Sequence, residues 1–282
     1  MMYIDDATLD RWIQEDAPYL DLTTHLLGIG ARPARLTFRA RTDMVVCGTE
    51  EARRVLGKLG VTVEYVWPNG RPSPAGQVLL VASGPAGALH LAWKLCVNLM
   101  EYASGIATRT CELVTAARAV SPRVELVATR KGFPGTRALA IKAVLAGGGS
   151  PHRLGLSETI LVFGQHRALF ATPDEFFRQI PAWKARAPEK KFLVEAEGID
   201  DALAAVRAGA DGIQFDKLPP SELAKAVSLL RAVRQDLALI AAGGIVPGNV
   251  AAYAATGVDA LATSTVFHGP PADIAATILP AD

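Results

Sequence analysis

From about residue 121 onward, short apolar runs alternate with helix-forming segments, and this alternation constrains the fold more than any other feature. The runs typical of strands are VELVAT (124–129), TILVF (159–163), KFLVEA (191–196), DGIQFD (211–216), LALIAAGG (237–244) and DALATST (259–265). The helix-forming segments are 134–146, 173–186, 200–208, 219–234, 248–256 and 271–279. Continuous apolar strands that alternate with helices predict a parallel sheet with both faces covered.

Six or seven such units in one series favour an incomplete β/α barrel over an open sheet. A dinucleotide-binding sheet is disfavoured because no GxGxxG pattern follows the first strand. The first hundred residues have a mixed α+β pattern. It predicts helices over 7–16 and 49–60, strands within 34–48 and 61–83, and a long helix over 85–120 that softens at Ser104-Gly105. The chain therefore predicts an α/β protein with two parts.

The nearly balanced charge excludes some classes of partner. The chain has 29 Lys and Arg against 28 Asp and Glu, so it offers no global field for nucleic acid or an acidic membrane. Cys47, Cys96 and Cys111 have no CxxC spacing, which argues against a disulfide framework or a zinc site. The acidic start does not resemble a signal peptide and no apolar run is long enough to span a membrane, so we expect a cytoplasmic protein.

Polar residues interrupt the apolar runs near the ends of the predicted strands. In a β/α barrel the functional residues lie at the carboxyl ends of the strands. The residues that fall there are the carboxylates Glu195 and Asp216 and the small-residue turns Gly243-Gly244 and Thr263-Ser264. Either carboxylate alone could form a structural ion pair, and the glycines could make only a tight turn. Such a turn before a helix also offers backbone N–H groups to a phosphate, so we expect an anion site here.

The segment 128–153 concentrates positive charge and contains no Asp or Glu. Its cations are Arg130, Lys131, Arg137, Lys142, His152 and Arg153. We place Pro134 at the first position of the helix 134–146, which the glycines 147–149 end. Arg137 and Lys142 then lie on a solvated helix face, whereas the other four cations flank turns at the rim. This predicts a site for a multiply anionic ligand, with the carboxylates able to hold Mg²⁺ against its phosphates.

The stretch TRKGFPGTRALAIKAVLAGGGSPHRLGLSETIL (129–161) closely resembles the signature of the quinolinate phosphoribosyltransferases, the nicotinate-nucleotide pyrophosphorylases. Further motifs follow in the family's order, so the likeness covers nearly the whole chain. They are DLTT (21–24), NLMEYASGIATRT (98–110), VEAE (194–197), FD (215–216) and AAGGI (241–245). The segments EYASGIATRT and LVFGQHR are most similar to the family's ModD branch, which is associated with molybdate-transport operons.

The resemblance implies an N-terminal α/β sandwich domain over 1–108 and a C-terminal incomplete β/α barrel over 109–282, with the last residues allowed to pack back on the first domain. It also implies a homodimer whose active site is shared across the interface. In the implied reaction, the nitrogen of a small aromatic acid attacks C1 of 5-phosphoribosyl-1-pyrophosphate (PRPP). Pyrophosphate leaves with Mg²⁺, and quinolinate as the acid also loses CO2.

Roles for individual residues follow from the resemblance. Arg130, Lys131, His152 and Arg153 match the family's cations for the acid and the phosphates. Glu195 and Asp216 match the carboxylates that hold Mg²⁺ and the ribose hydroxyls. Gly243, Gly244, Thr263 and Ser264 match the cradle of the 5′-phosphate. Of these residues, we expect Arg130, Lys131, Glu195 and Asp216 to act in catalysis.

Three departures from the family pattern affect the acceptor half of the site. Phe163 stands where the family has a ligand-binding lysine, and Gly164 follows where it has an aspartate. Lys94 stands where a neighbouring subunit offers an arginine to quinolinate, and Ala242 replaces a serine. Loss of a buried cation that pairs with a ligand carboxylate costs about 2–5 kcal/mol. We therefore expect the acceptor to differ from quinolinate.

Two other functions fit parts of the pattern. A phosphosugar lyase or isomerase would use the late glycine-rich turns but leaves the basic segment unexplained. A non-catalytic protein that binds a phosphorylated metabolite or an oxyanion such as molybdate would use the cations without needing Glu195 or Asp216.

Overall fold

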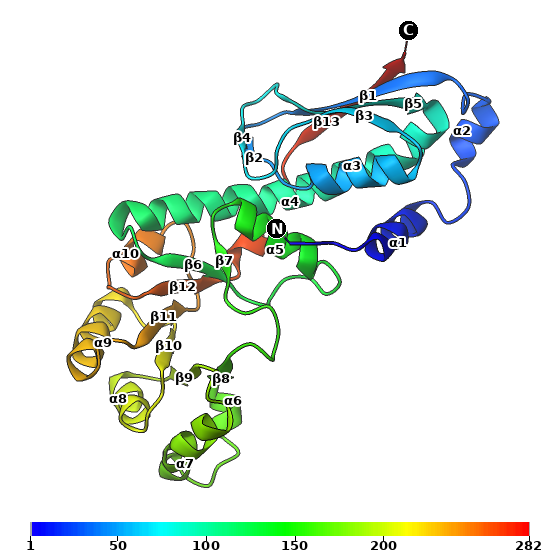
Figure 1. Cartoon of the computed structure of the whole chain (residues 1–282). Coiled ribbons are helices and arrows are strands. Elements are labelled where there is room, and N and C mark those ends of the chain that lie inside the picture. Colours follow the sequence, from blue (N-terminus) through cyan, green and yellow to red (C-terminus); the bar gives the residue numbers. More distant parts are fainter. Residues whose placement is uncertain (1, 282) are drawn as a thin grey trace. The chain divides into compact units, whose positions relative to one another are not determined.

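The computed structural model describes residues 2–281, which form two compact units (Figure 1). The first unit holds the described residues up to Cys111, Gly132–Gly148 and those from Val266 on. The second unit holds Glu112–Lys131 and Gly149–Thr265. These units are not two consecutive stretches of sequence, so the division at residues 108 and 109 stays a prediction.

The first unit is built on a four-stranded antiparallel sheet with the order β13-β1-β5-β3 (Figure 1). Its strands are β1 (Pro33–Ala40), β3 (Thr62–Val66), β5 (Val78–Pro85) and β13 (Ile274–Pro280). Along β1 buried and solvent-facing residues alternate, and Leu36 and Phe38 point into the core. A separate pair, β2 (Met44–Val45) and β4 (Pro72–Ser73), completes the strands of this unit.

The first unit contains five helices or parts of helices among the described residues, and the ends of two of them have clear causes in the sequence. They are α1 (Asp6–Asp16), α2 (Leu22–Leu27), α3 (Thr49–Lys58), α5 (Arg137–Ala146) and the first part of α4 (Ala86–Val120). The Asp5 carboxylate caps α1 by accepting from the Thr8 N–H at 2.6 Å. Gly60, which follows α3, has a φ of 76°, as expected of a glycine that ends a helix.

The long helix was predicted to soften at Ser104-Gly105, and α4 is continuous through both residues. Gly105 instead permits a close approach of two backbones. A Cβ there would lie 2.9 Å from the Pro270 carbonyl oxygen, so only glycine fits. The Ser104 hydroxyl donates to the Cys47 carbonyl at 3.1 Å, which ties α4 to the segment before α3.

The predicted helix over 271–279 is wrong. Residues Ile274–Pro280 form the strand β13, which pairs antiparallel with residues 34–40 of β1. The segment carries the β-branched Ile274, Thr277 and Ile278, which favour strands, and it is too short for a stable helix of its own. The free edge of β1 supplies the backbone partners that decide the outcome.

The second unit is a parallel-strand half-barrel with seven strands in the order β7-β6-β12-β11-β10-β9-β8 (Figure 1). The strands are β6 (Glu125–Ala128), β7 (Ser150–Pro151), β8 (Ile160–Val162), β9 (Phe192–Ala196), β10 (Gly212–Asp216), β11 (Ala238–Ala242) and β12 (Ala260–Thr263). All six neighbouring pairs are parallel. Within the described part of the chain β7 and β8 are the edges, so the predicted incomplete β/α barrel is confirmed.

The helices of the second unit follow its strands. They are α6 (Gly164–Arg167), α7 (Pro173–Arg186), α8 (Ile199–Arg207), α9 (Pro220–Val233) and α10 (Val250–Ala254), with a short 3-10 turn η1 (Thr265–Phe267) after β12. Inside the half-barrel, Leu161, Leu193, Ile240, Ala242 and Ala262 form one buried apolar cluster. The apolar runs in the sequence are therefore strands that contribute to a common core.

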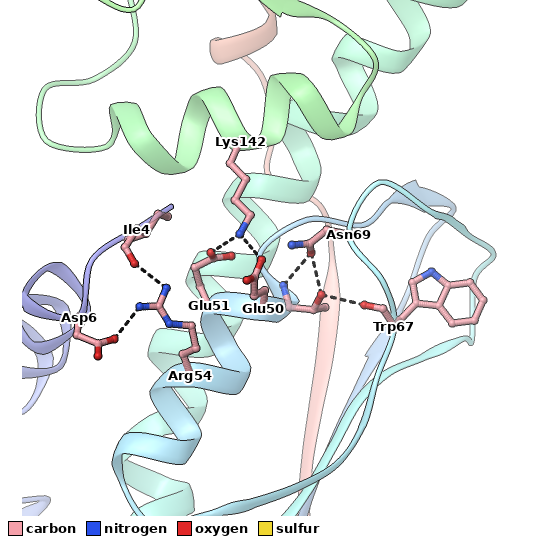
Figure 2. A network of polar contacts seen from close by, with 9 residues as sticks. Ile4, Asp6, Glu50, Glu51, Arg54, Trp67, Asn69 and Lys142 are labelled. Atoms are coloured by element: carbon pink, nitrogen blue, oxygen red, sulfur yellow. Dashed lines mark hydrogen bonds and ion pairs between the residues drawn. The ribbon is translucent and has the colours of Figure 1, made fainter. Parts of the chain in front are cut away.

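Helix α5 differs from its prediction at two points. It begins at Arg137, so Pro134 lies before the helix and not at its first position. Lys142 is only 7% exposed, so its placement on a solvated face is wrong. Its amine contacts Glu50 at 2.5 Å and Glu51 at 2.6 Å, both on α3 (Figure 2). Arg137 is exposed as predicted. None of the helices within residues 2–281 has the length and apolar character that crossing a membrane requires.

Candidate functional site

A cavity of about 200 Å³ lies at the carboxyl ends of the parallel strands in the second unit. All seven strands, or the residues that directly follow them, contribute to its wall. The lining residues are Thr129, Arg130, Lys131, His152, Arg153, Leu161, Phe163, Glu195, Gln214, Asp216, Ala242, Gly243 and Ala262. Its floor belongs to the apolar cluster inside the half-barrel, because Leu161, Ala242 and Ala262 are members of both. The cavity is therefore apolar below and charged at its rim.

One side of the rim carries the four cations predicted from the basic segment. Arg130 and Lys131 follow β6, whereas His152 and Arg153 follow β7. Within the described residues no carboxylate forms an ion pair with Arg130, Lys131 or Arg153. Burial lowers the pKa of Arg153, and the neighbouring Arg130 charge lowers it further. Such a cluster favours an anionic ligand, which would relieve its mutual repulsion.

His152 is held in its neutral form. Burial lowers the pKa of its imidazole below the ordinary value, and the charge of Arg153 acts in the same direction. At neutral pH the ring is therefore a hydrogen-bonding group rather than a fourth positive charge beside Arg130, Lys131 and Arg153.

The other side of the rim carries the two predicted carboxylates. Glu195 lies on β9 and Asp216 is the last residue of β10. Glu195 Oε2 accepts a hydrogen bond from Gln214 Nε2 at 2.8 Å. Burial raises the pKa of the Glu195 carboxyl; the Gln214 bond opposes this rise, while the Asp216 charge adds to it. The negative charges of the two carboxylates therefore repel each other at the ends of the strands.

The turn after β11 is shaped around Asp216. Gly243 has a φ of 81°, and a Cβ there would overlap Asp216 Oδ1 and lie 2.6 Å from Lys217 Cγ. Lys217 itself has a φ of 57°, the only positive φ outside glycine among the described residues. Its N–H donates to the Ala242 carbonyl at 2.7 Å. A strained residue and a required glycine therefore hold the end of β10 in one place.

Phe163 contributes an aromatic ring where the family signature has a lysine. The Arg153 guanidinium carbon lies 5.6 Å from the centre of this ring, a cation–π distance. The Phe163 N–H donates to His166 Nδ1 at 3.0 Å, and the two rings stack with centroids 5.8 Å apart. The sequence did not point to His166 as the partner that fixes Phe163.

Four predicted site residues do not line this cavity. The Gly244 carbonyl accepts from Asn249 Nδ2 at 2.9 Å, and the Thr263 hydroxyl donates to the Ile245 carbonyl at 2.9 Å. Ser264 follows Thr263 at the end of β12. Lys94 lies on α4 in the first unit, with its amine 4.6 Å from the centre of the Trp93 ring. Their roles as phosphate and acceptor ligands stay predictions.

The cavity also includes residues that the sequence did not single out. They are Thr129, Leu161, Gln214, Ala242 and Ala262. Gln214 had a detectable signal in the sequence, because it is a polar residue inside the apolar run GIQFD. The structure adds that it stands opposite Glu195 in the register of β9 and β10.

The two carboxylates fit Mg²⁺ only together with a ligand's own oxygens. Among residues 2–281 no group of three or more His, Cys, Asp or Glu side chains is arranged to hold a metal ion. Mg²⁺ is usually held by one or two carboxylates plus water and substrate phosphates. Glu195 and Asp216 match that incomplete donor set.

Comparison with protein families gives two matches that together cover most of the chain. The domain described as "Quinolinate phosphoribosyl transferase, N-terminal domain" matches residues 21–104. The domain described as "Quinolinate phosphoribosyl transferase, C-terminal domain" matches residues 106–276.

Individual relatives agree with these matches. The chain is 44% identical over 251 residues to "Putative pyrophosphorylase ModD" of Rhodobacter capsulatus, covering 89% of this chain and 96% of that protein. It is 33% identical over 267 residues to "Nicotinate-nucleotide pyrophosphorylase [carboxylating]" of Mycobacterium leprae, covering 93% and 92%. The solved structure of the nicotinate-nucleotide pyrophosphorylase from Francisella tularensis has a TM-score of 0.89 at 24% identity, covering 99% of this chain and 98% of the other, and shows the fold.

Proposed function

Because the chain belongs to the quinolinate phosphoribosyl transferase family, we propose that it transfers the 5-phosphoribosyl group of PRPP to a small aromatic acid that contains a ring nitrogen. The observation that carries this proposal is the convergence of three cations, the His152 imidazole and two carboxylates on one cavity. A ligand with several phosphates and a sugar needs both kinds of group.

The proposed reaction breaks the bond between C1 of the ribose and the pyrophosphate oxygen and forms a bond from C1 to the acceptor nitrogen. Positive charge develops on the ribose ring as the first bond breaks. Glu195 and Asp216 would stabilise that charge, and Arg130, Lys131 and Arg153 would bind the departing pyrophosphate. Mg²⁺, held by Glu195 and Asp216, would neutralise further phosphate charge.

We propose that the acceptor is not quinolinate. The Phe163 ring occupies the place of a family lysine and lies against Arg153. A dicarboxylate therefore finds one cation fewer on this wall, while an apolar or aromatic face gains a partner. An acid with fewer carboxylates than quinolinate fits this wall best.

We propose further that the active protein is a homodimer in which Lys94 of each chain completes the other chain's site. The first unit exposes a run of large apolar side chains around α2, namely Tyr19, Leu20, Leu22, Leu26 and Leu27. An exposed apolar patch of this kind favours association. Sedimentation or light scattering should give twice the chain mass, and a monomer that turns over would contradict this arrangement.

The function is tested by incubating purified protein with PRPP, Mg²⁺ and a panel of aromatic and heterocyclic acids, and measuring pyrophosphate release. Release with one acid and not with quinolinate is the expected result. Robust formation of nicotinate mononucleotide from quinolinate would contradict the altered acceptor. Binding of phosphate or molybdate that needs neither Mg²⁺ nor Glu195, without any pyrophosphate release, would instead favour a non-catalytic oxyanion-binding protein.

A further inference from the structure

Gln214 is a buried polar side chain in the middle of an apolar strand. It lies on β10 between Ile213 and Phe215, and only 5% of it is exposed. Its register partner on β9 is Glu195, so the two side chains leave the sheet on the same face. The resulting bond, Gln214 Nε2 to Glu195 Oε2, measures 2.8 Å.

The rest of the Gln214 amide is directed at the cavity. A glutamine amide has two N–H donors and an oxygen with two lone pairs. One N–H serves Glu195, and no described residue bonds the amide oxygen. The amide oxygen is not completely buried, so a small molecule in the cavity can reach it. Since Gln214 lines the cavity, a ligand or water there completes its hydrogen bonding.

We propose that Gln214 is a positioning residue for Glu195. Its N–H holds Oε2 and leaves Oε1 turned toward the ligand, while its amide oxygen accepts a hydrogen bond from a hydroxyl of the phosphoribosyl group. This inference rests on the proposed function for the identity of the ligand. The contact between Gln214 and Glu195 does not depend on that identity.

The setting of Glu195 makes such a donor necessary. Among the described residues Gln214 is the only hydrogen-bond partner of the Glu195 carboxylate. This one bond therefore decides which of the two carboxylate oxygens faces the cavity. Glu195 also shares the cavity, or its immediate edge, with other charged or titratable groups. They are Arg130, Lys131, His152, Arg153 and Asp216 in the cavity, and Arg167, whose guanidinium donates to the Glu195 carbonyl and pairs with Asp201.

The first test determines the orientation of the Glu195 carboxylate directly. Crystal structures of the wild type, of Gln214→Met and of the exposed control Gln235→Met are compared. The Glu195 carboxylate should keep one orientation in the wild type and in Gln235→Met, and should leave it or occupy several orientations in Gln214→Met. An unchanged orientation in Gln214→Met would overturn the assignment, whatever reaction the protein performs.

The second test asks whether Gln214 acts through Glu195. In Gln214→Met, kcat/KM for pyrophosphate release should fall about 10- to 100-fold, as expected for loss of a hydrogen bond to a charged group. In a Glu195→Gln background the same substitution should cost clearly less than in the wild type, because only the contact of the amide oxygen with the ligand is then lost. Equal losses in both backgrounds would contradict positioning. If the Glu195 carboxylate changes orientation in Gln214→Met while wild-type protein with Mg²⁺ shows no calorimetric binding of PRPP, the proposed function fails and the Gln214–Glu195 assignment stands.

Discussion

The Lys142 amine lies 2.6 Å from Glu51 Oε1, and the Glu51 side chain has no exposed surface (Figure 2). Glu50 shares the same amine, while Glu51 Oε2 is buried without any hydrogen-bond partner. Burial by itself would lower the pKa of Lys142, but the hydrogen bonds from its amine to Glu50 and Glu51 outweigh burial and raise it. The pair therefore ties α5 to α3 as a charged group inside the first unit.

Replacing Lys142 by methionine should destabilise the protein strongly. The substitution leaves the Glu51 carboxylate buried without a counter-charge, which costs about 3–5 kcal/mol in comparable pairs. The free energy of unfolding from urea denaturation measures this loss. Arg137→Met, on the exposed face of the same helix, is the matched control and should change stability by about 0.5 kcal/mol or less. Equal values for the two variants would show that the pair contributes nothing.

Gly243→Ala should reduce activity and stability together. A Cβ at this position overlaps Asp216 Oδ1, and the φ of 81° costs an L-residue roughly 1–2 kcal/mol. Asp216 would have to move out of the cavity, so pyrophosphate release should fall by about two orders of magnitude, as for other displaced catalytic groups. Gly248→Ala, in the same loop and with open space around its Cβ, is the control. Normal kinetics in Gly243→Ala would show that the position of Asp216 does not matter.

Glu195→Gln should separate stability from activity. Its folded-state pKa lies above the ordinary value of 4.5, so ionising Glu195 costs the folded state stability as pH rises through that pKa. The glutamine variant removes this cost, and its melting temperature relative to the wild type should be higher at pH 7 than at pH 4. Its activity should fall about 10²–10³-fold, because the charge that stabilises the transition state is gone. A variant that is less stable at pH 7 than at pH 4, relative to wild type, would reverse the assigned direction.

The half-barrel could be predicted from sequence because six of its seven strands in the described chain lie in apolar runs, whereas the short strand β7 (Ser150–Pro151) has no such run and was not predicted. The rim residues could be predicted for the same reason, since the end of such a run marks the end of a strand. The strand β13 and the burial of Lys142 could not, because each depends on a partner far away in the sequence: β1 for the strand, and α3 for the lysine. The local sequence pattern indicates which secondary structure a segment prefers by itself, but not which distant segment it packs against.

Gln214 and Thr263 show the same limit within the site. Both are polar residues of parallel strands, Gln214 in the middle of β10 and Thr263 at the end of β12, and sequence reasoning selected only Thr263. The Thr263 hydroxyl donates a hydrogen bond to the Ile245 carbonyl, whereas Gln214 lines the cavity and donates a hydrogen bond to Glu195. Only the register between neighbouring strands, which the sequence does not display, decides which polar side chain meets a ligand.

Phe163→Lys should move the acceptor preference toward quinolinate. The substitution removes the ring that lies against Arg153 and restores the cation of the family signature. Since a buried charge pair with a ligand carboxylate is worth about 2–5 kcal/mol, kcat/KM for quinolinate should rise at least tenfold. Nicotinate mononucleotide formation measures the change. Phe163→Leu is the control, because it removes the ring without adding charge, and it should leave quinolinate use as low as in the wild type. Equal gains in the two variants would mean that the ring only blocks space, and no gain in either would place acceptor choice elsewhere in the cavity.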